Sequence, residues 1–217
     1  MASREDLIAA LRRNAPREVP LPDLSALGVK FADPAAQVVE AVKAVGGTCL
    51  RVPDLGAADR ALRELEAWRA AKRTVSLVPG VGEGNVDFAA LRAPKDLEGL
   101  DFTVLPGELA VAENGAVWLD AARLPERAVF VITEHLALVV QAATVVNDMH
   151  EAYARLASRP VAYGTFIAGP SKTADIEQAL VIGAQGARSC TVLLVGCIAA
   201  PQARSAATRA SSRARFA

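Results

Sequence analysis

The stretch of residues 163–195 constrains the fold most, because it reads as a complete strand–turn–helix–strand unit. An uncharged run at 166–168 has the length of a short strand, and a Gly-Pro pair ends it. Residues 171–183 begin with helix-capping types and continue with apolar positions at helical spacing. The apolar run 191–195 predicts a second strand. The unit therefore predicts an α/β sheet with polar residues at the carboxyl end of a strand, where such sheets usually bind ligands.

Polar and turn residues gather between this first strand and the expected helix. They are Gly169, Pro170, Ser171, Lys172, Thr173 and Asp175. Backbone N–H groups and hydroxyls at a helix start form an anion site for a carboxylate or a phosphate, and Lys172 adds a positive charge. Asp175 is expected to point at this site or to stabilise the turn. Simple helix capping, which needs no ligand, is the alternative.

The rest of the chain alternates between helical and strand patterns, which predicts one α/β domain with a mostly parallel central sheet flanked by helices. Helices are expected at 33–45, 57–72 and 147–157, and strands at 48–52, 74–78, 102–105, 116–119, 128–133 and 136–140. Three parts are expected: an N-terminal helix and extended arm (1–30), the α/β domain (31–195), and a disordered tail rich in Ala, Ser and Arg (196–217).

Composition excludes several classes of protein. The chain has 24 basic and 24 acidic residues among 217, and a neutral balance argues against nucleic acid as a partner. The N-terminus is charged instead of carrying a secretory leader, and the longest apolar zone, 128–146, is interrupted by Glu134 and His135, so we expect a cytoplasmic protein without a membrane span. Three cysteines without a C-x-x-C pair indicate reduced thiols, and no His, Cys and Asp cluster has metal-ligand spacing.

Two other stretches carry polar residues at sites that suit chemistry. Glu134 and His135 follow the expected strand 128–133, so they would lie at a strand's carboxyl end and contact a ligand; a structural histidine is the alternative. The glycine-rich segment 80–84 follows another strand, but its spacing matches neither G-x-G-x-x-G nor the Walker pattern. A phosphate-binding loop and a plain loop both remain open for it.

Glu113, Asn114 and Gly115 form an expected turn before the strand 116–119. The glycine would allow the backbone to approach a ligand closely, and the Glu113 carboxylate could accept hydrogen bonds or act as a base or nucleophile. The alternative is a turn glutamate that faces water. Elsewhere the chain shows no Gly-x-Ser-x-Gly elbow and no convincing nucleophilic triad.

The ten residues 169–178, Gly-Pro-Ser-Lys-Thr-Ala-Asp-Ile-Glu-Gln, followed by Gly183 and Gly186, closely resemble the signature of the LUD-domain family. The resemblance covers roughly residues 31–195. Gln185 and Ala187 depart from the family's usual Gly-x-His-Gly-Pro turn, so this chain has no imidazole at that place. The resemblance implies a fold similar to the NagB/RpiA/CoA transferase group, in which a comparable Glu-Asn-Gly triplet supplies the attacking glutamate.

The same resemblance implies work in the oxidation of L-lactate to pyruvate, beside partner subunits that hold iron–sulfur clusters. This chain would carry no cofactor itself. Two hypotheses follow. The first is an accessory component of a lactate-oxidising assembly, with the Glu113 and Ser171 regions forming its ligand or docking site. The second is a freestanding enzyme that handles a carboxylate, CoA ester or sugar phosphate through Glu113. Replacing Glu113 by Gln distinguishes them, because only the enzyme requires that carboxylate for turnover.

Overall fold

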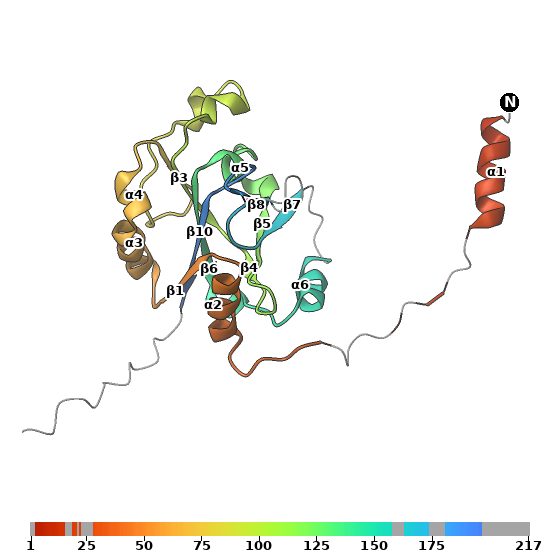
Figure 1. Cartoon of the computed structure of the whole chain (residues 1–217), viewed down its shortest axis with the longest axis horizontal. Coiled ribbons are helices and arrows are strands. Elements are labelled where there is room, and N and C mark those ends of the chain that lie inside the picture. The colour runs from red at the N-terminus through yellow and green to blue at the C-terminus, as the bar shows by residue number, and fades with distance from the viewer. Residues whose placement is uncertain are drawn as a thin grey trace, which may run out of the picture.

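The structure is a computed structural model, and it describes residues 3–15, 19, 20, 22, 28–157, 163–173 and 181–196. The arm predicted at 14–27 is described only in part, and the tail beyond 196 lies outside the described residues. The helix expected from the N-terminal sequence is confirmed as α1 (Arg4–Asn14). Ser3 and Asp6 form a capping box at its start, and none of its residues is buried. Figure 1 shows α1 apart from the body of the protein.

A five-stranded parallel sheet forms the centre of the molecule, as the alternating sequence pattern predicts. Its strands are β1 (Thr48–Val52), β2 (Thr74–Ser76), β3 (Phe102–Pro106), β6 (His135–Gln141) and β10 (Ser189–Val195). They lie in the order β1-β10-β6-β3-β2, so the two longest and most apolar strands pair at the centre. Sheets of this kind are covered on both faces, which accounts for the unbroken apolar runs in the sequence.

The two faces of the central sheet carry separate apolar cores. Leu136, Leu138 and Val140 of β6 face one core, and Ala137 and Val139 face the other. The helices α3 (Leu55–Glu64) and α4 (Glu66–Ala70) cover the second face (Figure 1). The first face packs against α2 (Pro34–Ala44), which begins as predicted with Asp33 as N-cap and a proline in the first turn.

A small antiparallel sheet lies on the α2 side of the central sheet. It consists of β4 (Leu109–Ala110), β5 (Val117–Asp120) and β7 (Gly164–Ile167) in that order. The helix α6 (Met149–Leu156) packs against it in a third apolar cluster with Trp118 and Phe166. Short 3-10 turns connect these parts: η1 (Phe88–Ala90), η2 (Pro94–Leu97), η3 (Ala121–Arg123) and η4 (Ala142–Thr144).

Three expected elements are corrected by the structure. The helix expected at 57–72 is divided, because Leu65 is extended (φ −67°, ψ 127°) and separates α3 from α4. The strand expected at 128–133 is wrong, since α5 (Val129–Ile132) is a helical turn and β6 alone occupies the place between β3 and β10. Strand propensity therefore gives way to tertiary context in this run.

The third correction concerns the helix expected after Pro170. Residues 172–173 and 181–182 form the antiparallel strands β8 (Lys172–Thr173) and β9 (Val181–Ile182). Asp175 and the intervening residues 174–180 lie outside the described residues. Ser171, Lys172 and Thr173 therefore do not begin a helix, and the argument for an anion site from a helix N-terminus no longer holds.

Candidate functional site

Several sequence-predicted residues meet at the amino-terminal edge of the central sheet. His135, Ser189 and Phe102 are the first residues of three neighbouring strands and stand side by side in register. Ser171 is joined to the same edge, because its N–H donates to the carbonyl of Ala187 at 2.8 Å. The sequence placed Glu134 and His135 at the carboxyl end of a strand. That placement is wrong, since β6 begins at His135 instead of ending before it.

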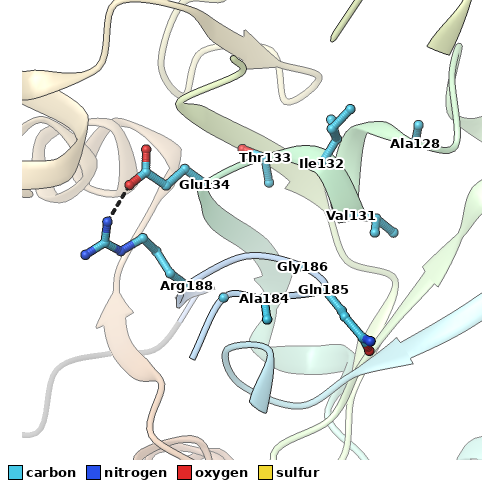
Figure 2. Close-up of a pocket in the computed structure, with 10 residues that line it drawn as sticks. Ala128, Val131, Ile132, Thr133, Glu134, Ala184, Gln185, Gly186 and Arg188 are labelled. Carbon is cyan, nitrogen blue, oxygen red and sulfur yellow. Dashed lines mark hydrogen bonds and ion pairs between the residues drawn. The ribbon is translucent and has the colours of Figure 1, made fainter. Parts of the chain in front are cut away.

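An open pocket of about 550 Å³ lies at this edge. One wall comes from α5 and the residues around it, and the other from the loop that precedes β10 (Figure 2). The lining residues are Ala128, Val131, Ile132, Thr133, Glu134, Gly183, Ala184, Gln185, Gly186 and Arg188. Among the sequence-predicted site residues that the structure describes, only Glu134 lines it, while the signature glycines Gly183 and Gly186 form part of the loop wall.

The loop wall is held in place by backbone contacts with Ser171. The N–H of Gly183 donates to the carbonyl of Ser171 at 3.0 Å. A Cβ at Gly186 would lie 3.2 Å from that of Ser171, and one at Gly183 (φ +86°) would lie 2.6 Å from that of Arg188. Both glycines therefore allow close packing of the loop, and Ser171 supports the pocket from behind.

An ion pair lies at one side of the pocket. Nη1 of Arg188 donates to Oε1 of Glu134 at 2.7 Å, and the backbone N–H of Arg188 donates to the carbonyl of Glu134 at 2.9 Å. Figure 2 shows this pair on one side and Ala128, Val131 and Ile132 on the other. Arg188 is not among the sequence-predicted site residues, because its one sequence signal, a position directly before the apolar strand β10, predicts no site by itself.

His135 lies beside this pair, but it points toward the α4 side of the sheet. Its ring stacks on Phe102 with centroids 5.9 Å apart, and Phe102 meets Trp68 edge-on. Burial lowers the pKa of His135 and outweighs the raising charge of Glu134, so the neutral ring is favoured. Its Nδ1 is 2.7 Å from Oγ of Ser189, which links β6 to β10.

A neutral imidazole beside a hydroxyl is the first requirement of a nucleophilic pair. The pair also needs a group that orients the ring, and Oε1 of Glu134 is 3.9 Å from Nε2 of His135, beyond hydrogen-bonding distance. The geometry therefore supports a structural link by His135 and Ser189.

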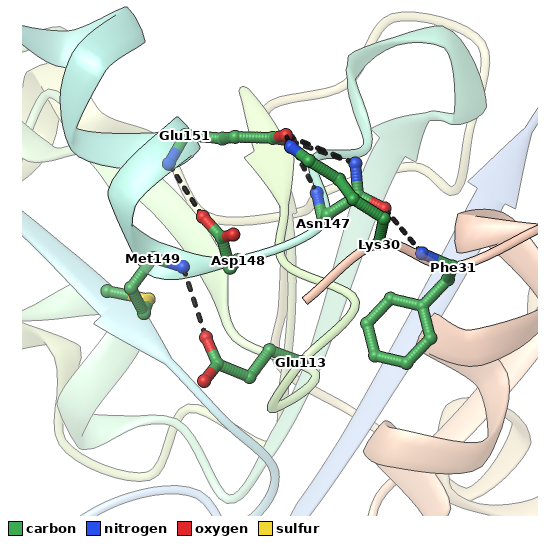
Figure 3. A network of polar contacts seen from close by, with 7 residues as sticks. All are labelled: Lys30, Phe31, Glu113, Asn147, Asp148, Met149 and Glu151. Carbon is green, nitrogen blue, oxygen red and sulfur yellow. Dashed lines mark hydrogen bonds and ion pairs between the residues drawn. The ribbon is translucent and has the colours of Figure 1, made fainter. Parts of the chain in front are cut away.

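Glu113 lies elsewhere, at the beginning of α6. Its Oε2 accepts the N–H of Met149 at 3.2 Å, which satisfies one of the open donors at the helix N-terminus (Figure 3). The predicted turn is confirmed: Gly115 has φ +71°, and its N–H donates to the carbonyl of Val111. Gly115 allows the close approach of α2, because a Cβ at this position would lie 2.7 Å from the backbone nitrogen of Val42.

Gly169 and Lys172 also contact α2, at its C-terminal end. Gly169 has φ +74°, and a Cβ there would lie 2.8 Å from the carbonyl oxygen of Val45. Pro170 is buried, and Nζ of Lys172 would lie 3.2 Å from a Cβ on Gly46. A lysine suits the negative end of a helix. These residues of the signature thus pack the β7–β8 turn onto α2.

The glycine-rich segment 80–84 packs on the helices of the other face. A Cβ at Gly82 would lie 2.7 Å from the ring of Trp68, and the N–H of Gly82 donates to Oδ1 of Asp59 at 2.8 Å. Val81 is fully buried. This favours the plain-loop interpretation, because the loop's conformation is set by α3 and α4.

Within the described ranges no group of three or more His, Cys, Asp or Glu side chains could hold a metal ion. Cys190 is buried, and that burial raises the pKa of its thiol to about 12. No helix in the described part of the chain is long and apolar enough to cross a membrane.

Comparison with known proteins supplies three findings. The family model "LUD domain" matches residues 83–195, more than half of the chain. Lactate utilization protein C from Geobacillus kaustophilus is 30% identical over 164 residues, which is 71% of this chain and 65% of the relative, so the match spans less than two thirds of that protein. A crystal structure of a DUF162 family protein from Deinococcus radiodurans has the same fold, with a TM-score of 0.57 at 18% identity, over 77% of this chain and 99% of that one.

Proposed function

The chain belongs to the LUD domain family, and on that premise we propose that it is an accessory component of a system for lactate utilization. The relative named lactate utilization protein C is the observation that carries the proposal, because the match to it extends over 71% of this chain. The finer proposal is that the system oxidises L-lactate to pyruvate in the cytoplasm, with the electron carriers on partner subunits.

The cysteines of this chain support the proposal that the iron–sulfur clusters are held by other subunits. An iron–sulfur cluster is usually held by four cysteine thiolates, and this chain has three cysteines in all. Of these, Cys190 is buried in the apolar core, and that burial raises the pKa of its thiol to about 12, which opposes its use as a cluster ligand. The residues of this chain therefore do not fit a cluster of their own, and we propose that iron–sulfur subunits are its partners.

We further propose that the amino-terminal edge of the central sheet is the ligand or docking surface in that system. Glu134 reaches the pocket directly, and Ser171 fixes the loop opposite α5. Gly169, Pro170 and Lys172 would act by holding the β7–β8 turn on α2, and Thr173 by pairing β8 with β9.

The alternative of a freestanding enzyme that uses Glu113 as nucleophile gains little support. Its carboxylate accepts an N–H at the start of α6, which is a sufficient structural reason for the residue. Turnover of carboxylates, CoA esters and sugar phosphates by wild type and Glu113→Gln tests this alternative. Turnover by the wild type that is lost in a folded Glu113→Gln variant would replace the accessory role with the enzymatic one.

The accessory role is tested by affinity purification of the tagged chain from its own cells grown on lactate. We expect iron–sulfur subunits to be recovered in near-equal amounts, and we expect deletion of the gene to abolish growth on L-lactate but not on glucose. A variant with both Val131 and Ile132 changed to Ser tests whether the pocket edge takes part in docking. Normal growth of the deletion strain on L-lactate would refute the role.

A further inference from the structure

We propose that the pocket between α5 and the loop before β10 binds an amphipathic organic acid, with its carboxylate on Arg188 and its hydrocarbon body over α5. This names a ligand class for the surface proposed above, but it does not require the role in lactate utilization. The proposal combines three features of the pocket: an exposed guanidinium, an exposed aliphatic wall, and a volume much larger than a three-carbon acid.

The polar end of the ligand would meet Arg188. A guanidinium has five N–H donors in a planar fork that matches a carboxylate. Nη1 is engaged by Glu134, and the remaining donors have no partner among the described residues. The side chain is 61% exposed, so these donors are accessible to a ligand, while Glu134 holds the guanidinium in position. Because the Glu134 charge partly opposes an anion, the head-group contact orients the ligand and contributes modest affinity.

The apolar wall consists of side chains that the fold leaves open to solvent. Val131 is 47% exposed and Ile132 is 38% exposed, and both line the pocket from the short helix α5. Ala128 and Ala184 add methyl groups, and two glycines of the opposite loop add no side chain at all. Large aliphatic side chains exposed together in a concave surface are typical of a binding site, in contrast to single exposed residues on convex surfaces.

The volume decides between a small and a larger acid. The pocket measures about 550 Å³, within the range of sites for ligands with tens of heavy atoms. L-lactate has only six heavy atoms, and at no more than the roughly 30 Å³ that a water occupies each, it would fill about a third of this space. A medium-chain aliphatic carboxylate would fill more of this volume and could cover the exposed wall with its chain while its carboxylate binds Arg188, so we identify this class as the ligand.

The fold also prepares the loop wall for binding. Two backbone hydrogen bonds tie Ser171 to the loop, at 2.8 Å to Ala187 and 3.0 Å from Gly183. The ion pair and the backbone bond between Arg188 and Glu134 fix the other end of the loop to β6. Both walls are thus in place before a ligand arrives, which reduces the entropy cost of binding.

The test is a calorimetric titration of the full chain with butanoate, hexanoate and octanoate, kept below micelle-forming concentrations. Complete burial of one methylene corresponds to about fourfold in affinity, so in an open pocket we expect about two- to fourfold per added methylene. L-lactate should bind at least as weakly as butanoate. 1-Octanol, which keeps the chain but lacks the charge, should bind about tenfold more weakly than octanoate.

Variants assign the binding to this pocket. Arg188→Gln should weaken octanoate about tenfold and remove its advantage over 1-octanol. Val131→Ser should reduce the gain in affinity per added methylene, while octanoate should still bind more tightly than 1-octanol. Arg123→Gln is the matched control, because Arg123 is a similarly exposed arginine, 69%, that pairs with Glu108 and Asp120 away from the pocket; it should leave binding unchanged.

Equal affinities for butanoate, hexanoate and octanoate would overturn the proposal. Octanoate affinity that is unchanged in Arg188→Gln and also unchanged in Val131→Ser would overturn it as well. Failure of every acid to bind at millimolar concentration would also overturn it. If a protein that co-purifies with the wild type were then absent from the Val131→Ser preparation, the pocket would be identified as a protein interface. Growth on L-lactate is a separate measurement, so this proposal and the proposed function can fail independently.

Discussion

Replacement of Gly115 by Ala tests whether this glycine serves the packing of α2 or the approach of a ligand. Gly115 has φ +71°, a conformation that costs an alanine about 1 kcal/mol. The added Cβ would lie 2.7 Å from the nitrogen of Val42 and 2.9 Å from the carbonyl carbon of Ala41, where ordinary contacts begin at 3.4 Å. Because both atoms belong to a helix backbone, the helix must move, and overpacking of this kind costs about 1–3 kcal/mol.

Gly115→Ala should therefore lower the free energy of unfolding by about 2–4 kcal/mol in total. Gly99→Ala is the matched control, since Gly99 has φ +75° but no atom within 4 Å of its hypothetical Cβ. It isolates the backbone cost of about 1 kcal/mol. Urea unfolding, monitored by the fluorescence of Trp68 and Trp118, gives the free energy of unfolding of both variants. Equal losses in the two variants would refute the packing argument and restore a ligand as the reason for Gly115.

Two further predictions concern titrating groups. The Lys30 ammonium and the N–H of Asn147 lower the pKa of Glu151 to about 2 (Figure 3), below the ordinary 4.5, so this carboxylate stabilises the fold above pH 4.5 and that contribution is lost as pH falls toward 2. Thermal unfolding of wild type and Glu151→Gln should thus differ at pH 6 and converge near pH 2; a constant difference would contradict the assignment. Burial raises the pKa of the Cys190 thiol to about 12, so iodoacetamide at pH 7.5 should label Cys190 only after unfolding, as mass spectrometry of its peptide would report; rapid labelling of the native protein would contradict the burial.

Local sequence signals predicted most of the central fold. Asp33 and Pro34 predict the start of α2, and the strand-type runs 48–52 and 191–195 predict β1 and β10. The run 128–133 was assigned to the wrong class, because its β-branched residues suit a strand and its short helix depends on contacts far along the chain. The helix predicted to include residues 172–173 is wrong for the same reason, because the strand β8 depends on its pairing with β9.

The candidate site could be predicted only in pieces. The signature at 169–173 was recognised as important, but the sequence could not say that Gly169 serves to approach Val45 or that Ser171 supports a loop that follows it. Glu113 was singled out for its carboxylate, and its partner at Met149 lies 36 residues away. The sequence shows the chemistry of each side chain, but the residue that the side chain contacts depends on the fold.

The sequence by itself determined that the chain forms an α/β sheet, because alternating helical and apolar patterns are local properties that each segment carries with it. It also determined the family, through a contiguous signature. Only the tertiary structure decided which edge of the sheet gathers the polar residues, and that Arg188 meets Glu134 across a separation of 54 residues. Strand order and register produce that meeting, and they follow from the combined packing of all five strands, which no single segment encodes.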